Sequence, residues 1–172
     1  MTAPRPGARA NPAASMFQVS AGANFSRCRR YRYTLWRSWD EKRPKVMIIG
    51  LNPSTADARN TDPTIRRCIG FSNDWGYGGL IVTNLFAFRA TYPADLKAAV
   101  DPVGPRNDVW IRRMARQVET IVAAWGNDGA WLGRSARLRR MFAGRLHCIR
   151  LNACGEPAHP LYLPARLRPR EW

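Results

Sequence analysis

The chain is organised around residues 46–57, which read Val46-Met47-Ile48-Ile49-Gly50-Leu51-Asn52-Pro53-Ser54-Thr55-Ala56-Asp57. The first four residues form an unbroken apolar run, which is typical of a strand buried on both faces. Gly50 ends this strand, and a loop of small polar residues follows at its carboxyl end. Ligands of open α/β sheets bind in the crevice outside the carboxyl ends of the strands. The loop is therefore the first candidate site, and its polar members are Asn52, Ser54, Thr55 and Asp57.

The rest of the chain alternates predicted strands with predicted helices. Apolar runs predict further strands at residues 80–84, 120–125 and 146–151. Helical spacing predicts helices that begin near residues 62, 108 and 132, the first with Asp62 as its N-cap. Alternating arginine and apolar residues at 25–39 predict a hairpin, and residues 85–107 are expected to be a long connection. This order favours a three-layer α/β/α sandwich with a central, mostly parallel four-stranded sheet plus an N-terminal β-hairpin.

Length and composition predict one folded domain. We expect residues 1–24 to form a disordered basic tail and residues 25–172 to form a single α/β domain. No run of 18 apolar residues is present, and the first 15 residues lack the apolar core of a secretory signal. The expected protein is a cytoplasmic monomer that does not enter a membrane.

The net charge of +16 is concentrated towards the two ends of the chain. Residues 1–45 carry ten basic and two acidic side chains, and residues 131–172 carry nine and two. Residues 46–130 carry nine and eight, so the middle is almost neutral. Basic ends suit a polyanion, and arginine, which outnumbers lysine, binds phosphate with two parallel hydrogen bonds. We therefore expect a polyanion as the partner, and the alternative is a genome that favours arginine throughout.

The four cysteines indicate no metal site. Cys28, Cys68, Cys148 and Cys154 form no CxxC pair, whereas structural zinc and iron–sulfur sites usually contain a closely spaced pair. We expect reduced thiols, no metal and no cofactor.

Three polar clusters follow predicted strands and are expected to meet. The first is the loop that holds Asn52, the second is Thr83-Asn84 with Arg89 after it, and the third is His159-Pro160. Because parallel strands present their carboxyl ends at one edge of a sheet, these clusters should share one site.

Four blocks of the sequence resemble a bacterial and phage family known only as domain of unknown function 1643. The blocks read GLNPSTAD, DPTIRRCIGF, VTNLFAFR and HPLYLP, and the resemblance extends over about residues 27–164. Gly50-Leu51-Asn52-Pro53 also resembles the first motif of the uracil-DNA glycosylase superfamily, most closely the Gly-Ile-Asn-Pro of its mismatch-specific thymine/uracil branch. Thr83-Asn84-Leu85 is similar to that branch's second stretch, and His159-Pro160-Leu161 is similar to the superfamily's His-Pro-Ser loop.

The glycosylase resemblance implies roles for the residues of these motifs. Asn52 would position a water against the sugar C1′, and His159 would donate to the developing charge on the departing base. Asp57 would either stabilise the sugar cation or cap the next turn. Asn84 would read the edge of an extruded base, and either Phe86 or Phe88 would stack under it.

A pocket wall of small residues distinguishes this chain from the strict uracil enzymes. Those enzymes carry a bulky tyrosine after the proline of the first motif, whereas Ser54 and Thr55 follow Pro53 here. The small residues leave room for a larger or modified base.

Further residues are expected to contact DNA. Leu161 or Tyr162 would fill the space left by a flipped base, unless the two residues are only part of an ordinary loop. Arg89, Arg166 and Arg168 would bind phosphates.

The leading hypothesis is a monofunctional DNA glycosylase that removes a damaged, mismatched or modified base, in repair or in conflict with phages. None of the three lysines lies near the motifs, so Schiff-base chemistry is not expected. One alternative is a nucleic-acid-binding module without catalysis. The other is a hydrolase of small nucleotides or nucleosides with Ser54 and Thr55 as phosphate donors, although the chain lacks a GxxxxGK[ST] loop.

Overall fold

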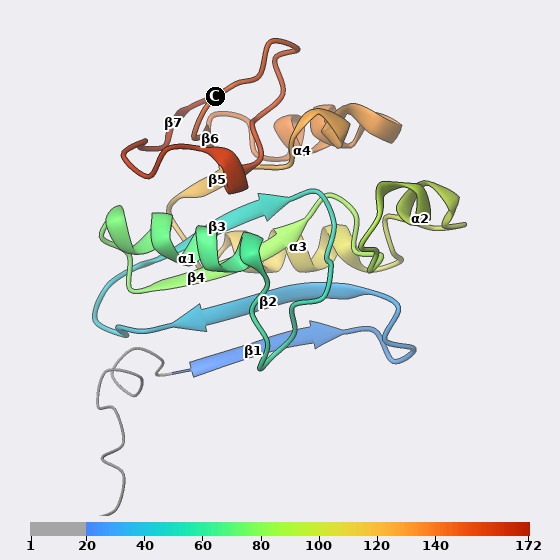
Figure 1. Ribbon diagram of the computed structural model, residues 1–172, viewed down its shortest axis with the longest axis horizontal. Helices are drawn as coiled ribbons and strands as arrows, with labels where there is room; N and C mark the ends of the chain where they lie inside the picture. Colours follow the sequence, from blue (N-terminus) through green and yellow to red (C-terminus); the bar gives the residue numbers. More distant parts are fainter. Residues whose placement is uncertain (1–19) are drawn as a thin grey trace, which may run out of the picture.

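The computed structural model describes residues 20–172, which fold around one sheet (Figure 1). Most of the predicted tail at residues 1–24 lies outside the described residues. Its last part, however, belongs to strand β1 at Ser20–Phe25, so the folded domain begins before residue 25.

The sheet has seven strands in the order β1-β2-β4-β3-β5-β6-β7, and Figure 1 shows them in this order from bottom to top. After β1 the strands are β2 at Arg32–Ser38, β3 at Lys45–Gly50, β4 at Gly79–Asn84, β5 at Ile121–Ala123, β6 at Leu146–Cys148 and β7 at Arg170–Glu171. Strands β4, β3, β5 and β6 pair in parallel. Strands β1 and β2 at one edge and β7 at the other pair in antiparallel fashion.

The α/β class is confirmed, but the predicted extent of the sheet is wrong. The N-terminal hairpin is not a separate unit, because β2 pairs directly with β4 and places Leu35 opposite Val82. At the other edge, the C-terminal strand β7 pairs with β6. Both additions cover unpaired backbone groups at the edges of the parallel strands, where exposed donors and acceptors would otherwise remain.

The helices lie between the strands largely as predicted, and α2 is an additional helix. They are α1 at Pro63–Asp74, α2 at Pro93–Ala98, α3 at Asn107–Ala115 and α4 at Arg134–Met141, with short 3-10 helices η2 at Asn127–Gly133 and η3 at Pro160–Tyr162. Asp62 caps α1 as predicted, since its Oδ1 accepts from the backbone N–H of Ile65 at 2.8 Å. Helix α2 lies inside the connection at 85–107, which is therefore not irregular throughout.

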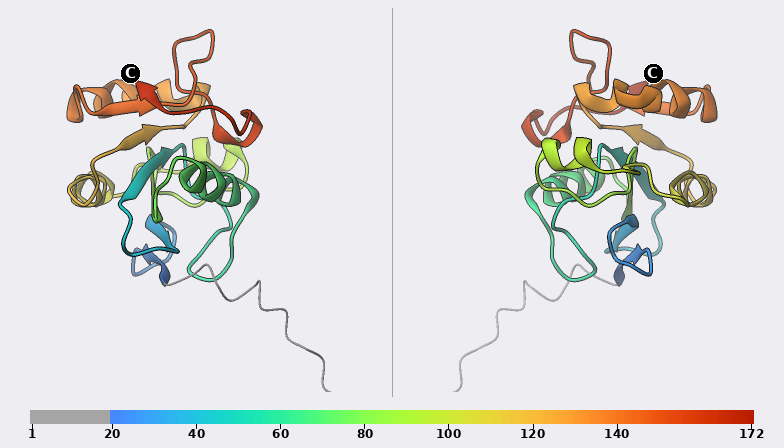
Figure 2. Two further views of the ribbon diagram at one scale, coloured as in Figure 1. Left: turned by 90° about the vertical axis from the view of Figure 1, so that its left-hand side faces the viewer. Right: turned by 90° about the vertical axis from the view of Figure 1, so that its right-hand side faces the viewer.

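Apolar side chains fill both faces of the sheet. Helix α1 packs on one face, where Ile65, Cys68 and Phe71 join a cluster with residues of β3 and β4. Helix α3 packs on the opposite face, where Ile111 and Met114 join a second cluster. Figure 2 shows α1 and α3 on opposite sides of the sheet. Within residues 20–172, no helix is long and apolar enough to cross a membrane.

Candidate functional site

A cavity of about 260 Å³ opens at the carboxyl ends of β3, β4 and β5. Its wall includes Gly50 from the end of β3, Asn84 from the end of β4 and Ala124 directly after β5. Strand β3 has β4 on one side and β5 on the other, so the chain reverses its direction across the sheet at this point. Crevices at such a reversal are the usual ligand sites of open α/β sheets.

The cavity brings together residues that are distant in sequence. Asn52 follows β3, Asn84 ends β4, and His159 precedes η3; all three line the same space, as does Ser54. Each member comes from a segment fixed by the sheet or by a helix that packs on it. The arrangement therefore supplies two amides, a hydroxyl and an imidazole around one opening.

Asn52 is held in a single orientation by backbone carbonyl groups. Its Nδ2 donates to the carbonyl oxygen of Ala90 at 2.8 Å and to that of Pro53 at 3.1 Å. Both N–H groups of the amide are thus used, and among the described residues nothing donates to Oδ1. The side chain offers the cavity an acceptor, which suits a water or a ligand N–H.

Asn84 presents a hydrogen-bond donor, whereas Asn52 presents an acceptor. The residue is 3% exposed, and its Nδ2 is buried without a hydrogen-bond partner in the described part of the chain. Its Oδ1 lies against Gly50, where a Cβ would approach it to 2.9 Å. A buried amide donor without a partner costs free energy, so this one is suited to an acceptor that a ligand brings.

His159 is a half-buried neutral imidazole. Its Nδ1 accepts from the backbone N–H of Leu161 at 3.4 Å, which leaves the proton of the neutral ring on Nε2. Burial lowers the pKa of His159 below its usual value, and the nearby carboxylate of Asp62 only partly opposes this effect. The ring can therefore donate a hydrogen bond from Nε2 without carrying a charge.

Sequence reasoning missed Arg32, which also lines the cavity. The residue is 2% exposed, and its NH1 donates to the carbonyl oxygen of Ala56 at 2.6 Å. The alternating pattern at residues 25–39 predicted a hairpin, whereas β2 lies inside the sheet between β1 and β4, and the loop after β3 accepts the hydrogen bond of Arg32. Asp62, which the sequence identified only as a helix cap, lines the same cavity.

Asp57 does not join the cavity. Its Oδ1 accepts from the backbone N–H groups of Arg59 and Asn60, each at 2.8 Å, and so closes a turn. These hydrogen bonds lower the pKa of Asp57 to about 2. Of the two roles the sequence left open, the structure places Asp57 in the cap and away from the cavity wall, which corrects its inclusion among the catalytic candidates.

Phe86 is also misplaced by the sequence prediction. The residue is fully buried in the cluster that packs on α3, where its ring lies 4.9 Å from the ring of Trp131. Because β4 is covered on both faces, the side chain after its end turns into the core and not toward the cavity. It is not available to stack under a base.

A second hollow of about 330 Å³ adjoins the cavity and is lined by arginines. Arg29, Arg30 and Arg89 surround it together with Thr55, and Ser54 belongs to both spaces. Thr55 thus lies beside the cavity and not in it. Arg89 lines this hollow, and its contact with a phosphate stays a prediction.

The remaining predicted DNA contacts lie near η3 and beyond. Tyr162 is 86% exposed, and Leu161 is half-buried beside His159. Arg166 and Arg168 are exposed and lie near the end of α1, where Arg168 donates to the carbonyl oxygen of Asp74. None of these four residues lines the arginine hollow.

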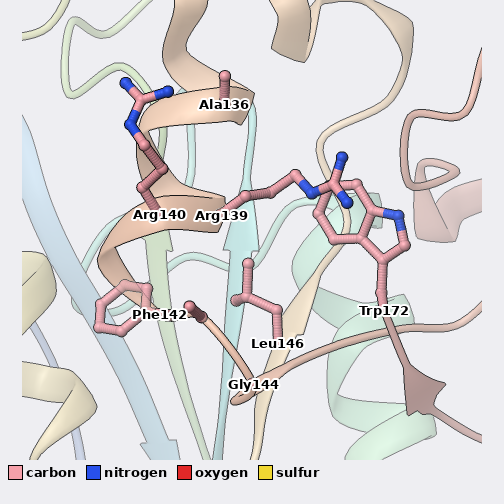
Figure 3. A pocket seen from close by; sticks show the side chains of 8 residues that line it. Ala136, Arg139, Arg140, Phe142, Gly144, Leu146 and Trp172 are labelled. Atoms are coloured by element: carbon pink, nitrogen blue, oxygen red, sulfur yellow. The ribbon is translucent and has the colours of Figure 1, made fainter.

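The hollow of about 480 Å³ at the far edge of the sheet is larger but chemically plain (Figure 3). Ala136, Phe142 and Leu146 supply apolar walls. The guanidinium of Arg139 lies 4.5 Å from the ring of Trp172 and stacks on it, as Figure 3 shows. The wall holds no amide, carboxylate or imidazole side chain, so the smaller cavity is the candidate site.

Comparison with known proteins gives one match. The family described as "Protein of unknown function (DUF1643)" matches the chain over residues 32–161. No curated protein and no solved structure matches the chain. The matched range begins at Arg32 and ends just after His159, so it contains all the polar cavity residues described above.

Proposed function

The chain belongs to the DUF1643 family, and from the contents of its cavity we propose that it is a monofunctional DNA glycosylase. The enzyme would flip a damaged, mismatched or modified base out of the duplex and hydrolyse its N-glycosidic bond. We further propose kinship with the uracil-DNA glycosylase superfamily, with the four parallel strands and the helices on their two faces as the shared sandwich.

One observation carries the proposal: Asn52, Asn84 and His159 surround one cavity of about 260 Å³. Pockets for drug-sized ligands begin at about 300 Å³, so this space suits a smaller group such as a single nucleobase. Its wall offers an acceptor from Asn52 and donors from Asn84 and His159. A nucleobase edge carries both kinds of partner.

Asn52 would orient the attacking water. Its Oδ1 accepts one O–H of the water, and because the amide is fixed by Ala90 and Pro53, the position of the water is fixed as well. The water oxygen bonds to C1′ and its proton passes to solvent. An amide is a weak base, so Asn52 contributes position and not proton abstraction, and a modest rate is expected.

His159 and Asn84 would act on the base. As the bond from C1′ to the base nitrogen breaks, its electron pair moves onto the base. Donation from Nε2 of His159 to a base oxygen stabilises that charge. The neutral imidazole can make this hydrogen bond because its proton lies on Nε2. Nδ2 of Asn84 would hold a second acceptor on the ring.

Hydrolysis without a Schiff base is proposed because, in the described part of the chain, no lysine lines the cavity. The three lysines are Lys42, Lys45 and Lys97, and none lines the cavity. A covalent imine to C1′ requires an amine at the reacting carbon. The proposed product is an intact strand with an abasic site.

The adjoining hollow supports DNA as the partner. Arg29, Arg30 and Arg89 would bind the phosphates beside the flipped nucleotide, and Leu161 or Tyr162 would occupy the vacated stack. We further propose that the protein is a cytoplasmic monomer. The proposed setting is repair or conflict with phages.

A panel of duplexes tests the proposal. Each duplex carries one base, either uracil, hypoxanthine, mismatched thymine or a hypermodified cytosine, and alkali after incubation cleaves any abasic site. Wild-type protein is expected to produce alkali-dependent scission on at least one duplex, and His159→Ala is expected to abolish it. No scission with folded protein would favour the alternative of a binding module without catalysis.

A second candidate, a hydrolase of free nucleotides, is favoured by the contact between the two hollows. Ser54 lines both, so a base in one and a phosphate in the other would fit a single nucleotide. Release of base from nucleoside monophosphates, with no scission of duplexes, would select this function.

A further inference from the structure

Arg32 is a buried cation that forms no direct ion pair with a carboxylate of residues 20–172. The residue is 2% exposed, and the ion pairs within 4.0 Å among residues 20–172 do not include it. Burial lowers the pKa of Arg32 to about 10, so the guanidinium remains charged at neutral pH. A buried charge without a partner is costly, and arginine cannot escape that cost by losing its proton.

The donors of Arg32 are only partly used. NH1 donates to the carbonyl oxygen of Ala56, whereas Nε is buried with no partner in the described part of the chain. Asn84, which lines the same cavity, likewise has a buried and unpartnered Nδ2. Two unsatisfied donors on the wall of one cavity suit an acceptor-rich ligand.

Charges of both signs lie around Arg32, but no carboxylate of the described residues pairs with it directly. The guanidiniums of Arg37 and Arg89 act on Arg32, as do the carboxylates of Asp57 and Asp62. Of the two carboxylates, only Asp62 reaches the cavity wall, and its Oδ1 is occupied by the N–H of Ile65. Neither carboxylate forms an ion pair with Arg32 within 4.0 Å, and one oxygen of each already serves a helix cap or a turn.

We infer that Arg32 and Asn84 form an anion-binding subsite, and that the cavity holds a nucleobase in its anionic form. The identity of the ligand as a base rests on the proposed function, whereas its charge rests on Arg32. In hydrolysis the electron pair of the C1′–N bond stays with the base, which leaves as an anion while the water oxygen bonds to C1′. Arg32 compensates that negative charge, and the hydrogen bonds it makes to an anion are stronger than those to a neutral ring.

Equilibrium binding of two free ring compounds tests the subsite without requiring catalysis. Uracil is neutral at neutral pH, whereas barbiturate has a similar size and shape and is an anion. Titration calorimetry on wild-type protein should show barbiturate bound at least about tenfold more tightly. In Arg32→Gln this ratio should fall to about one, and in Arg112→Gln, which changes an exposed arginine of α3, it should stay as in wild type.

A thermal-unfolding scan shows whether each variant folds. If Arg32→Gln does not fold, Arg32→Lys replaces it, and its ratio should fall at least about threefold because lysine lacks the planar fork. The inference is overturned if wild type binds both rings equally, if it binds neither, or if the substituted protein keeps the full ratio.

The duplex panel separates this inference from the proposed function. A preference for barbiturate that depends on Arg32, without scission of any duplex, would keep the anion subsite and remove the glycosylase. Scission of a duplex by a protein that binds uracil and barbiturate equally would keep the glycosylase and remove the subsite.

Discussion

The side-chain amide of Asn52 donates from Nδ2 to the carbonyl oxygen of Ala90 at 2.8 Å. In return, the backbone N–H of Ala90 donates to the carbonyl oxygen of Pro53 at 2.9 Å. These two bonds join the loop after β3 to the loop after β4 in both directions. The acceptor that Asn52 turns to the cavity is therefore fixed by the same contacts that close the floor of the site.

Asn52→Asp should destabilise the protein more than Asn52→Ala. Aspartate removes both donated hydrogen bonds and places a carboxylate against two carbonyl oxygens, whereas alanine only removes the bonds. We expect losses of about 2–3 kcal/mol for aspartate and about 1 kcal/mol for alanine in the free energy of unfolding. Urea denaturation at neutral pH measures both, and equal stability of Asn52→Asp and wild type would mean that the amide is not oriented as described.

Gly50→Ala should displace the side chain of Asn84. The added Cβ would lie 2.9 Å from Oδ1 of Asn84, so this buried side chain must move. We expect a fall of about 1–3 kcal/mol in stability and a loss of base binding.

Gly70→Ala is the matched control for that substitution. Gly70 lies inside α1 with nothing within 4 Å of the added atom, so alanine there should raise stability by about 0.5–1 kcal/mol. Thermal unfolding compares the two variants. If alanine raised the stability at both positions, Gly50 and Asn84 would not be in contact.

Asp108→Asn should strongly destabilise the fold behind the site. Asp108 pairs with Arg134 at 2.6 Å, and Arg134, which is 4% exposed, also donates to the carbonyl oxygen of Leu85 just after β4. Removal of the carboxylate leaves a buried cation, at a cost of about 3–5 kcal/mol. Asp128→Asn breaks the exposed pair with Lys97 and should cost less than about 1 kcal/mol by the same urea titration. Similar costs for the two substitutions would be inconsistent with a structural role for the buried pair.

The Asp108 pair should also be lost in acid. Burial alone would raise the pKa of Asp108, but hydrogen bonds from Arg134 and Arg137 outweigh it and hold the pKa below its usual value. The unfolded chain therefore takes up the proton first, and stability falls as the pH drops below about 4 through the lower pKa of the folded state. Asp108→Asn should show a smaller loss over that range.

His159 should make stability depend on pH in a higher range. Burial lowers the pKa of His159 in the folded protein, so the unfolded chain binds this proton more readily. Stability is then complete above about pH 6.5 and declines as the pH falls through the lower folded pKa. Chemical denaturation between about pH 7.5 and 5 should show a steeper decline for wild type than for His159→Gln. Parallel curves would contradict the burial of a neutral imidazole.

Arg89 should contribute to the salt dependence of DNA binding. Each phosphate contact adds about 0.9 to the slope of log K against log salt, so Arg89→Gln should reduce the slope by about that amount, and Arg166→Gln likewise. Arg112→Gln, which changes an exposed arginine of α3 that lines neither the cavity nor the arginine hollow, should leave the slope unchanged. Fluorescence anisotropy over a range of salt concentrations gives the slopes. If Arg112→Gln reduced the slope as much as Arg89→Gln, the protein would attract DNA through its overall charge and not through defined contacts with the DNA backbone.

Much of the fold could be predicted because its signals are local. The apolar run before Gly50 and the cap at Asp62 each reflect a short-range rule, and both appear as expected. The meeting of Asn52, Asn84 and His159 follows from the parallel pairing of strands, since their carboxyl ends share an edge.

The errors arise where tertiary contacts decide. The sequence does not show that Arg32 is buried, because its contact with the carbonyl oxygen of Ala56 comes from a loop distant in sequence. Strand β7 is too short to leave a pattern in the sequence. Phe86 and Asp57 follow strands as site residues do, but the first turns into the core and the second closes a turn. Sequence alone identified which segments meet, and the direction of each side chain depended on its neighbours.

Single-turnover cleavage of the duplex panel by wild type and by Asn52→Ala, Asn84→Ala and His159→Ala tests the central claim most directly. With folded protein in every case, we predict scission by wild type on at least one modified or mismatched duplex and rates reduced by at least about a hundredfold in each variant. The account is contradicted if wild type cleaves none of the duplexes, or if it cleaves one and all three variants cleave it as fast.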